Sequence, residues 1–148
     1  MDATEYVLSR TPFVVRRTVR WGDCDPAGVV YTGRFTEYLL SAVQLFHQQL
    51  AGQDMESFRA RLNVQTPCKA MSLVFHRALW PNEVFDMAVT VGELRTSSYD
   101  LNVRASLPDG TRVFEGVFTP ICILTTERKS TAIPEELKRR LEAARETP

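Results

Sequence analysis

Hydrophobic residues along this chain follow two periods, one typical of strands and one typical of a long helix. Between positions 13 and 21, apolar and polar residues alternate, which predicts a half-buried strand. The apolar face of this strand consists of Phe13, Val15, Val19 and Trp21. From about Gly33 to Leu50 the apolar residues recur every three or four positions, which predicts a long, largely buried helix. A second, shorter helix is predicted from Met55 to Leu62.

After Pro67 the pattern returns to alternation and predicts four antiparallel strands. Their apolar positions fall within residues 69–75, 85–91, 99–105 and 113–124. The tripeptide Pro108-Asp109-Gly110 separates the last two strands and is a strong hairpin signal. Pro134 then opens a C-terminal helix, and Glu135 and Glu136 lie in its first turn, where acidic side chains are favoured.

The order of these elements predicts an α+β fold in a single domain spanning residues 1–148, with a core of about 13–141. A chain of 148 residues with 44% hydrophobic composition is long enough for one real core and short for two ordinary domains. One long helix covers only one face of a sheet, and an open antiparallel sheet leaves unpaired edges. We therefore expect a homo-oligomer, at least a dimer.

Charge and cysteine usage narrow the class of partner. Lysine plus arginine and aspartate plus glutamate number 18 each, so there is no positive surplus for binding nucleic acid. The three cysteines form no CxxC pair and are expected to be reduced thiols. The sequence shows neither a basic and apolar leader at its start nor an apolar run of spanning length. These observations predict a cytoplasmic protein with no membrane or nucleic-acid partner.

The most distinctive segment is the turn from Trp21 to Tyr31, which places Asp23 and Asp25 between the first strand and the long helix. A carboxylate there could act as a base or a nucleophile, and the unpaired N–H groups of a helix start could stabilise an oxyanion. The plainer alternative is that Asp25 only shapes the turn, as an aspartate before proline often does.

The segment Asp23-Cys24-Asp25-Pro26-Ala27-Gly28-Val29-Val30-Tyr31, together with the element order, resembles the 4-hydroxybenzoyl-CoA thioesterase family of the hotdog fold. The segments Pro81–Phe85, Pro108–Gly110 and Ala132–Leu137 also look like that family, and the resemblance covers roughly Phe13 to Leu141. It implies an antiparallel five-stranded sheet wrapped around a long central helix. It also implies dimers that often associate into homotetramers, with active sites at the dimer interface.

The resemblance further implies an acyl-CoA thioesterase that hydrolyses an acyl- or aroyl-CoA thioester to the free acid and CoA. The family's catalytic aspartate precedes Pro-Ala-Gly, and here that position is Asp25. Backbone N–H groups at the helix start polarise the carbonyl in the family, which corresponds here to Tyr31, Thr32 and Gly33. Whether Asp25 attacks the carbonyl as a nucleophile or activates water as a general base stays open.

Other residues are secondary candidates. Asp23 could share the chemistry, although a structural role in the turn is the better prediction. Glu37 lies one turn inside the helix, where another hotdog branch carries its catalytic carboxylate; a solvated or interface carboxylate is the preferred interpretation. Thr32 and Arg34 stand where many fatty-acyl members have histidine and asparagine, which disfavours an aliphatic substrate. The candidates for contacting CoA phosphates are Lys69, Arg95, Arg128 and Lys129.

Several alternatives remain open at this stage. The substrate could be an acyl-carrier protein, or the chain could be a hotdog dehydratase or hydratase, which would need His47 or His76 as its base. It could also be a non-catalytic acyl-binding module. Cys24 has no histidine nearby in the sequence, so a small packed thiol is the preferred interpretation of it. No residues have usable zinc-ligand spacing, so neither a metal nor a cofactor is expected.

Overall fold

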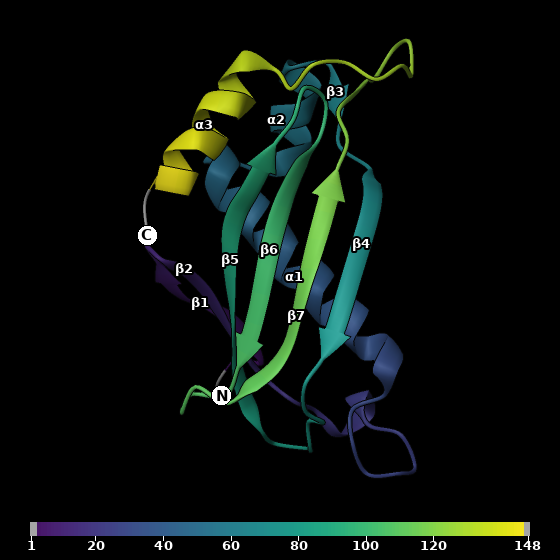
Figure 1. The fold of residues 1–148 in the computed structure, drawn as a ribbon, viewed down its shortest axis with the longest axis vertical. Helices are drawn as coiled ribbons and strands as arrows, with labels where there is room; N and C mark the ends of the chain where they lie inside the picture. Colours follow the sequence, from purple (N-terminus) through teal and green to yellow (C-terminus); the bar gives the residue numbers. More distant parts are fainter. Residues whose placement is uncertain (1–2, 147–148) are drawn as a thin grey trace.

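The computed structural model describes residues 3–146, and its dominant element is a six-stranded antiparallel sheet curled around one long helix (Figure 1). The sheet order is β1-β2-β5-β6-β7-β4. These strands span β1 Glu5–Arg10, β2 Phe13–Thr18, β4 Cys68–Phe75, β5 Val84–Leu94, β6 Tyr99–Ser106 and β7 Arg112–Pro120. A separate two-stranded ribbon pairs β3 (Val64–Gln65) with β8 (Ile123–Leu124). The predicted α+β arrangement is confirmed.

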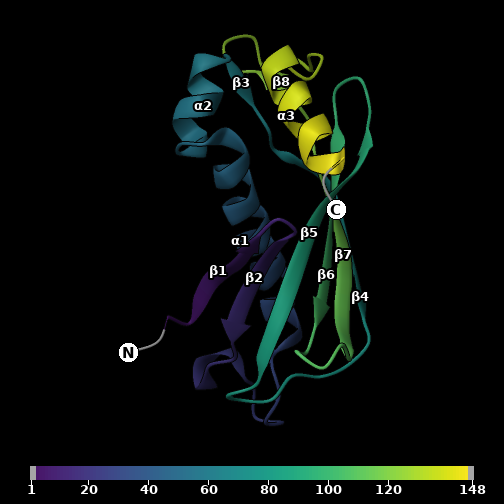
Figure 2. The ribbon, with the colours of Figure 1, turned by 90° about the vertical axis from the view of Figure 1, so that its left-hand side faces the viewer.

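The long helix α1 (Thr32–Ala51) lies in the concave side of the sheet, as Figure 2 shows from the side. Its buried residues follow the predicted spacing of three and four positions, although Leu50 at the end of the predicted stripe is only half-buried. They are Phe35, Tyr38, Leu39, Ala42, Val43, Phe46, His47 and Ala51. At the start of the helix, the ring of Phe35 packs edge-on against Phe75 at the end of β4, with 5.2 Å between centroids. The first turn of α1 and the last residue of β4 are therefore neighbours.

The two shorter helices and the hairpin also agree with the sequence. Helix α2 (Met55–Arg61) begins after Asp54, whose carboxylate accepts hydrogen bonds from the N–H and hydroxyl of Ser57. Helix α3 (Glu135–Glu146) follows Pro134 as predicted. Gly110 closes the hairpin between β6 and β7 with a φ of 93°, a left-handed value that glycine adopts freely. No helix among residues 3–146 is both long and apolar enough to cross a membrane.

The prediction of five strands is wrong by one, because β1 precedes the segment recognised as the first strand. Strand β1 pairs with β2, and its half-buried positions are Glu5, Val7 and Ser9, whereas its outer positions are exposed. Glu5 accepts a hydrogen bond from Arg17 at 2.6 Å and another from Ser41. The face of β1 that turns inward is thus partly polar, so its sequence lacks the apolar alternation by which half-buried strands are recognised.

Two further predictions need correction near the ends of strands. Trp21 does not extend the apolar face of the first strand, because β2 ends at Thr18 and the residues Trp21–Asp23 form a short 3-10 helix. Trp21 is 76% exposed. His76 is not within a strand, because β4 ends one residue earlier at Phe75.

Candidate active site

The turn that carries Asp25 is a closed hairpin beside the start of α1. Cys24 forms a β-bridge with Val30, and the N–H of Asp25 donates to the carbonyl of Val29 at 3.0 Å. Within this hairpin the N–H of Gly28 donates to the carbonyl of Asp25 at 2.9 Å. The residues Asp25-Pro26-Ala27-Gly28 suit the four positions of such a turn, and Gly28 has a φ of 85°.

The carboxylate of Asp25 is held by only one of its oxygens. The N–H of Ala27 donates to Oδ1 at 2.9 Å, which is the local bond an aspartate before proline commonly accepts. Among the described residues Oδ2 has no hydrogen bond or ion pair. The residue is half-buried. Asp25 therefore both shapes the turn and presents a free carboxylate oxygen, so the two sequence interpretations are compatible.

The start of α1 offers two unpaired N–H groups rather than three. The N–H of Tyr31 already donates to the carbonyl of Asp23 at 2.9 Å, so it is not available as an oxyanion donor. Thr32 and Gly33 begin the helix, and no acceptor for their N–H groups is found among the described residues. Of the three predicted oxyanion donors, Thr32 and Gly33 are retained and Tyr31 is not. The Tyr31 ring leans over Gly33, since a Cβ added there would lie 2.6 Å from Cε1 of Tyr31.

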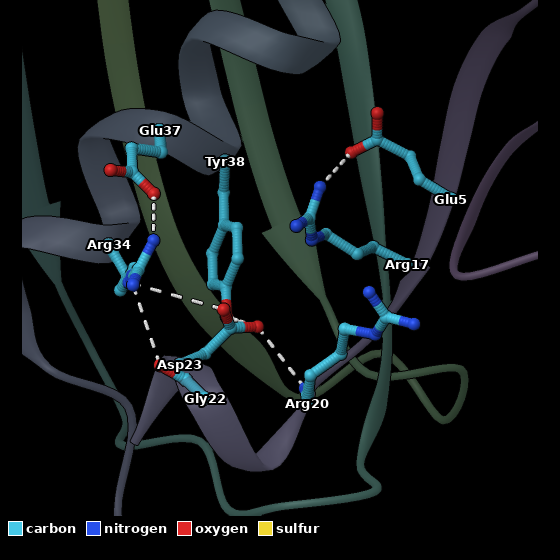
Figure 3. A network of polar contacts seen from close by, with 8 residues as sticks. All are labelled: Glu5, Arg17, Arg20, Gly22, Asp23, Arg34, Glu37 and Tyr38. Carbon is cyan, nitrogen blue, oxygen red and sulfur yellow. Dashed lines mark hydrogen bonds and ion pairs between the residues drawn. The ribbon is translucent and has the colours of Figure 1, made fainter. Parts of the chain in front are cut away.

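Asp23 lies in the interior and braces the turn against the helix. It is 8% exposed, and its Oδ2 accepts hydrogen bonds from the hydroxyl of Tyr38 at 2.8 Å and from the N–H of Arg20 at 3.2 Å. Figure 3 shows the carboxylate of Asp23 turned toward the hydroxyl of Tyr38. Burial, followed by this hydrogen bond, raises the pKa of Tyr38, so the phenol keeps its proton and stays a donor. The geometry suits a structural role for Asp23.

Glu37 points away from the turn and is engaged with its own helix. Arg34 donates to its Oε2 at 2.7 Å, and the Glu37 side chain is 62% exposed (Figure 3). The same guanidinium also approaches the carbonyl of Gly22 at 3.5 Å. Arg34 thus links the first turn of α1 to the segment that precedes Asp25.

The cysteine beside Asp25 is not an activated nucleophile. Burial, and then the negative charges of Asp23 and Asp25, raise the pKa of the Cys24 thiol. Its Sγ lies 3.7 Å from the carbonyl of Arg20. The thiol is therefore protonated at neutral pH.

Neither histidine lies at this turn. His47 is buried in the second half of α1 and contacts the hydroxyl of Tyr99 at 2.8 Å, and burial lowers its pKa to about 3. His76 lies 2.8 Å from a carboxylate oxygen of Glu115. These contacts give no support to the dehydratase alternative.

The four basic residues considered for CoA differ in availability. The guanidinium of Arg95 is held by both carboxylate oxygens of Asp100, at 2.9 and 3.0 Å. Lys69 lies on the exposed strand β4. Arg128 and Lys129 are exposed in the loop before α3, which projects at the top of Figure 1. Within residues 3–146, no group of three potential metal ligands comes together.

Sequence reasoning did not identify Tyr38 as the partner of Asp23, nor the pairing of Arg34 with Gly22. Tyr38 belongs to the regular apolar stripe of α1, so its spacing signals burial and nothing more. A buried tyrosine generally needs a partner for its hydroxyl, and an acidic residue in the preceding turn is one available signal.

Comparisons with known proteins place the chain in a family. Residues 19–141 match the thioesterase-like superfamily. A 1,4-dihydroxy-2-naphthoyl-CoA hydrolase from Thermosynechococcus vestitus is 26% identical over 131 residues, covering 88% of this chain and 89% of that protein.

Solved structures show the same fold. A thioesterase superfamily protein from Jannaschia is 26% identical, with a TM-score of 0.80 and 97% of each chain covered. A Staphylococcus aureus protein crystallised in complex with CoA is 14% identical, with a TM-score of 0.84, and covers 99% of this chain and 89% of its own. The resemblance seen in the sequence is thus confirmed at a broader level than the 4-hydroxybenzoyl-CoA enzymes. The chain belongs to the thioesterase-like superfamily and is a thioester hydrolase with the hotdog fold.

Proposed function

We propose that the protein hydrolyses an acyl- or aroyl-CoA thioester to the free acid and CoA, with Asp25 as its catalytic carboxylate. The observation that carries this proposal is the free Oδ2 of Asp25, held in a rigid hairpin beside the two unpaired N–H groups of Thr32 and Gly33. A carboxylate and a pair of oxyanion donors are the two components that thioester hydrolysis requires.

In this mechanism the carbonyl oxygen of the thioester accepts hydrogen bonds from the N–H groups of Thr32 and Gly33. These donors and the positive end of the helix dipole stabilise the negative charge that develops on that oxygen. Asp25 then acts by one of two routes: its oxygen attacks the carbonyl carbon and the resulting anhydride is hydrolysed, or it removes a proton from an attacking water. Either route consumes one water and releases CoA as its thiol together with the acid.

Two of the relatives support CoA as the thiol component. The Thermosynechococcus relative is named for hydrolysis of an aromatic acyl-CoA, and the Staphylococcus structure contains CoA. Lys69, Arg128 and Lys129 remain the candidates for contacting the CoA phosphates, because each is exposed and none has an ion pair among the described residues. Arg95 is the weakest of the four, since Asp100 already occupies its guanidinium.

We also propose that two copies of the chain pair through strand β4. This strand is an edge of the sheet, and from Ala70 to Phe75 it carries neither a charge nor a proline to discourage pairing. The apolar side chains of Met71, Val74 and Phe75 are exposed along it. The opposite edge strand, β1, contains the charged residues Glu5 and Arg10. Edge-to-edge pairing of β4 with a second copy would satisfy its free backbone groups and cover these side chains.

Such a dimer completes the site. Thr66 and Phe118 line a cavity of about 890 Å³ beside the second half of α1, and Thr66 lies just before the start of β4. From Thr32 to Leu40, where the wall of this cavity begins on α1, the helix rises about 12 Å, which sets the same chain's Asp25 apart from the cavity. Antiparallel two-fold pairing sets the start of one β4 against the end of the other. Because α1 begins beside the end of β4, the partner's Asp25 would face this cavity.

We further propose that two such dimers form a homotetramer. We also propose that the protein is located in the cytoplasm. The three cysteines are all free thiols, as is usual in a reducing compartment.

The test compares Asp25→Asn with wild type in a thiol-release assay on a panel of aromatic and aliphatic acyl-CoAs. Asparagine keeps the oxygen that accepts from Ala27, so the turn should persist while the charge is removed. Glu37→Gln is the matched control, because that carboxylate is exposed and, within residues 3–146, is bonded only to Arg34. Loss of turnover in a folded Asp25→Asn variant, with Glu37→Gln active, is expected. Full activity in Asp25→Asn would refute the assignment.

A further inference from the structure

The wall of the cavity beside α1 contains one cation, Arg59, that forms no ion pair with another described residue. This cavity lies between the second half of α1, helix α2 and the segment before β4, and a smaller hollow of about 450 Å³ adjoins it. Arg59 and Thr66 line both spaces. Apolar side chains such as Val43, Met55 and Phe118 form much of the remaining wall.

Three polar side chains beside this cavity, those of His47, Tyr99 and Thr66, interact with one another. Nε2 of His47 lies 2.8 Å from the hydroxyl of Tyr99, and its other ring nitrogen bonds to the carbonyl of Val43. Thr66 approaches the Tyr99 phenol, yet its own Oγ1 makes no hydrogen bond of good geometry among the described residues. The buried Thr66 hydroxyl is thus directed at Tyr99.

Arg59 is the cation of the cavity wall, which among the described residues also includes the carboxylates of Asp54 and Glu56. Its Nε is fully buried and meets no acceptor, and its guanidinium has no ion pair among the described residues. Neither nearby carboxylate pairs with Arg59: Asp54 caps α2 through Ser57, and Glu56 is exposed to solvent. Arg61, two residues further along the same helix, shows the contrast, since it reaches Glu136 at 2.6 Å. A buried guanidinium nitrogen without an acceptor is costly, which points to an acceptor supplied by a ligand.

We infer that the acyl group of the substrate carries a carboxylate at the end remote from the thioester, and that Arg59 binds it. This inference rests on the proposed function and on the β4 dimer, which places the reacting carbonyl at the partner's Asp25 and the body of the acyl group in this cavity. The apolar side chains of the wall accommodate a hydrocarbon or aromatic body. The planar guanidinium of Arg59 matches a carboxylate with two parallel hydrogen bonds.

The experiment measures binding rather than turnover, with non-hydrolysable thioether analogues of CoA. The probes are 4-carboxyphenacyl-CoA, its neutral isostere 4-carbamoylphenacyl-CoA, 4-hydroxyphenacyl-CoA and CoA alone, titrated by calorimetry. Wild type should bind the carboxylate analogue about tenfold or more tightly than the carbamoyl analogue, as expected for charge-assisted hydrogen bonds. Arg59→Gln should remove this preference, and Arg61→Gln, the control on the same helix, should retain it.

Three results would overturn the inference: equal affinity of wild type for the two isosteres, a preference that persists in Arg59→Gln, or tighter binding of the hydroxyl analogue than of the carboxylate. Weaker binding of CoA alone by Arg59→Gln would also overturn it, because Arg59 would then serve the CoA moiety. Arg59→Lys retains the positive charge but lacks the planar guanidinium. It should therefore show an intermediate preference for the carboxylate analogue over the carbamoyl analogue. Failure of the Asp25 assignment is distinguishable, because it appears as hydrolysis by Asp25→Asn and leaves these affinities unchanged.

Discussion

The hydroxyl of Tyr38 donates a 2.8 Å hydrogen bond to Oδ2 of Asp23, and this buried contact joins the central helix to the turn that carries Asp25. Arg17 lies over the Tyr38 ring, 4.7 Å from its centroid, and pairs with Glu5 of β1. The position of Asp25 is thus set by contacts that extend from the turn through α1 to the edge of the sheet (Figure 3).

Replacing Tyr38 with phenylalanine should lower both stability and activity. The buried carboxylate of Asp23 would lose its hydroxyl donor, at a cost of about 1–3 kcal/mol in the free energy of unfolding. Urea unfolding measures this loss. Tyr31→Phe is the control, since the Tyr31 side chain is exposed and its change should stay within about 0.5 kcal/mol. Equal stability of the two variants would show that the bond to Asp23 contributes nothing.

A side chain at Gly33 should reduce turnover without unfolding the protein. Alanine favours a helix over glycine, yet its Cβ would lie 2.6 Å from the Tyr31 ring and would displace that ring at the proposed oxyanion site. We expect Gly33→Ala to lower kcat by about tenfold or more, within the loss known for one oxyanion donor. Gly22→Ala, where nothing lies within 4 Å, is the control. Recovery of activity in the Tyr31→Ala, Gly33→Ala double variant would identify the ring as the cause. Wild-type kcat in Gly33→Ala would contradict the prediction that displacing the ring disturbs the oxyanion site.

The buried His47 should make the protein less stable as the pH falls. Its pKa is lowered to about 3 in the folded state, chiefly by burial, so the unfolded chain binds a proton first on acidification. Stability associated with this residue is complete above the ordinary histidine pKa and declines from there toward pH 3, by at most about 1.4 kcal/mol per pH unit. Urea unfolding of wild type and His47→Gln at pH 7 and pH 5 measures the difference. An unchanged gap between the two proteins at both pH values would contradict the prediction.

A charge on strand β4 should separate the subunits. Met71→Lys places an ammonium on the exposed edge, where two copies would meet with like charges. We expect light scattering after gel filtration to shift toward the monomer and hydrolysis to fall with it, with partial recovery at higher protein concentration. Tyr6→Lys introduces the same charge on the other edge strand and should keep the wild-type mass and activity. An active monomer would refute the shared site.

The regular hydrophobic periods of the sequence predict most of the helices and strands. They fail where a polar side chain is paired with a partner from another segment. Helix α1 was predicted to within one residue at each end, because its apolar stripe is continuous. Strand β1 escaped notice because Glu5, on its inner side, is neutralised by Arg17 from the neighbouring strand. Such a partner is invisible to a pattern read along one segment. Trp21 was assigned to the core because its spacing continued the alternation after the strand itself had ended.

The candidate site shows the same division. The turn around Asp25 was recognisable because proline and glycine at fixed positions set its backbone, and these are local requirements. The N–H of Tyr31 is not available as an oxyanion donor because it bonds to the carbonyl of Asp23, and this bond forms only when the hairpin closes. Arg59 gave no signal at all, since an arginine on a short helix is ordinarily solvated. Its significance comes from the acceptor it lacks in the folded chain.

If each site combines the cavity of one subunit with Asp25 of the other, two inactive variants should restore activity when mixed. Asp25→Asn removes the carboxylate, and Ala60→Trp, in the exposed face of α2 that lines the cavity, fills the acyl pocket. A mixed dimer then contains one site with both defects and one with neither, so random exchange of equal amounts should regenerate about a quarter of the wild-type sites. Thiol release before and after co-refolding measures this. If Asp25 instead served the cavity of its own chain, every site in the mixed dimer would carry one defect, and the mixture would stay as inactive as its parents.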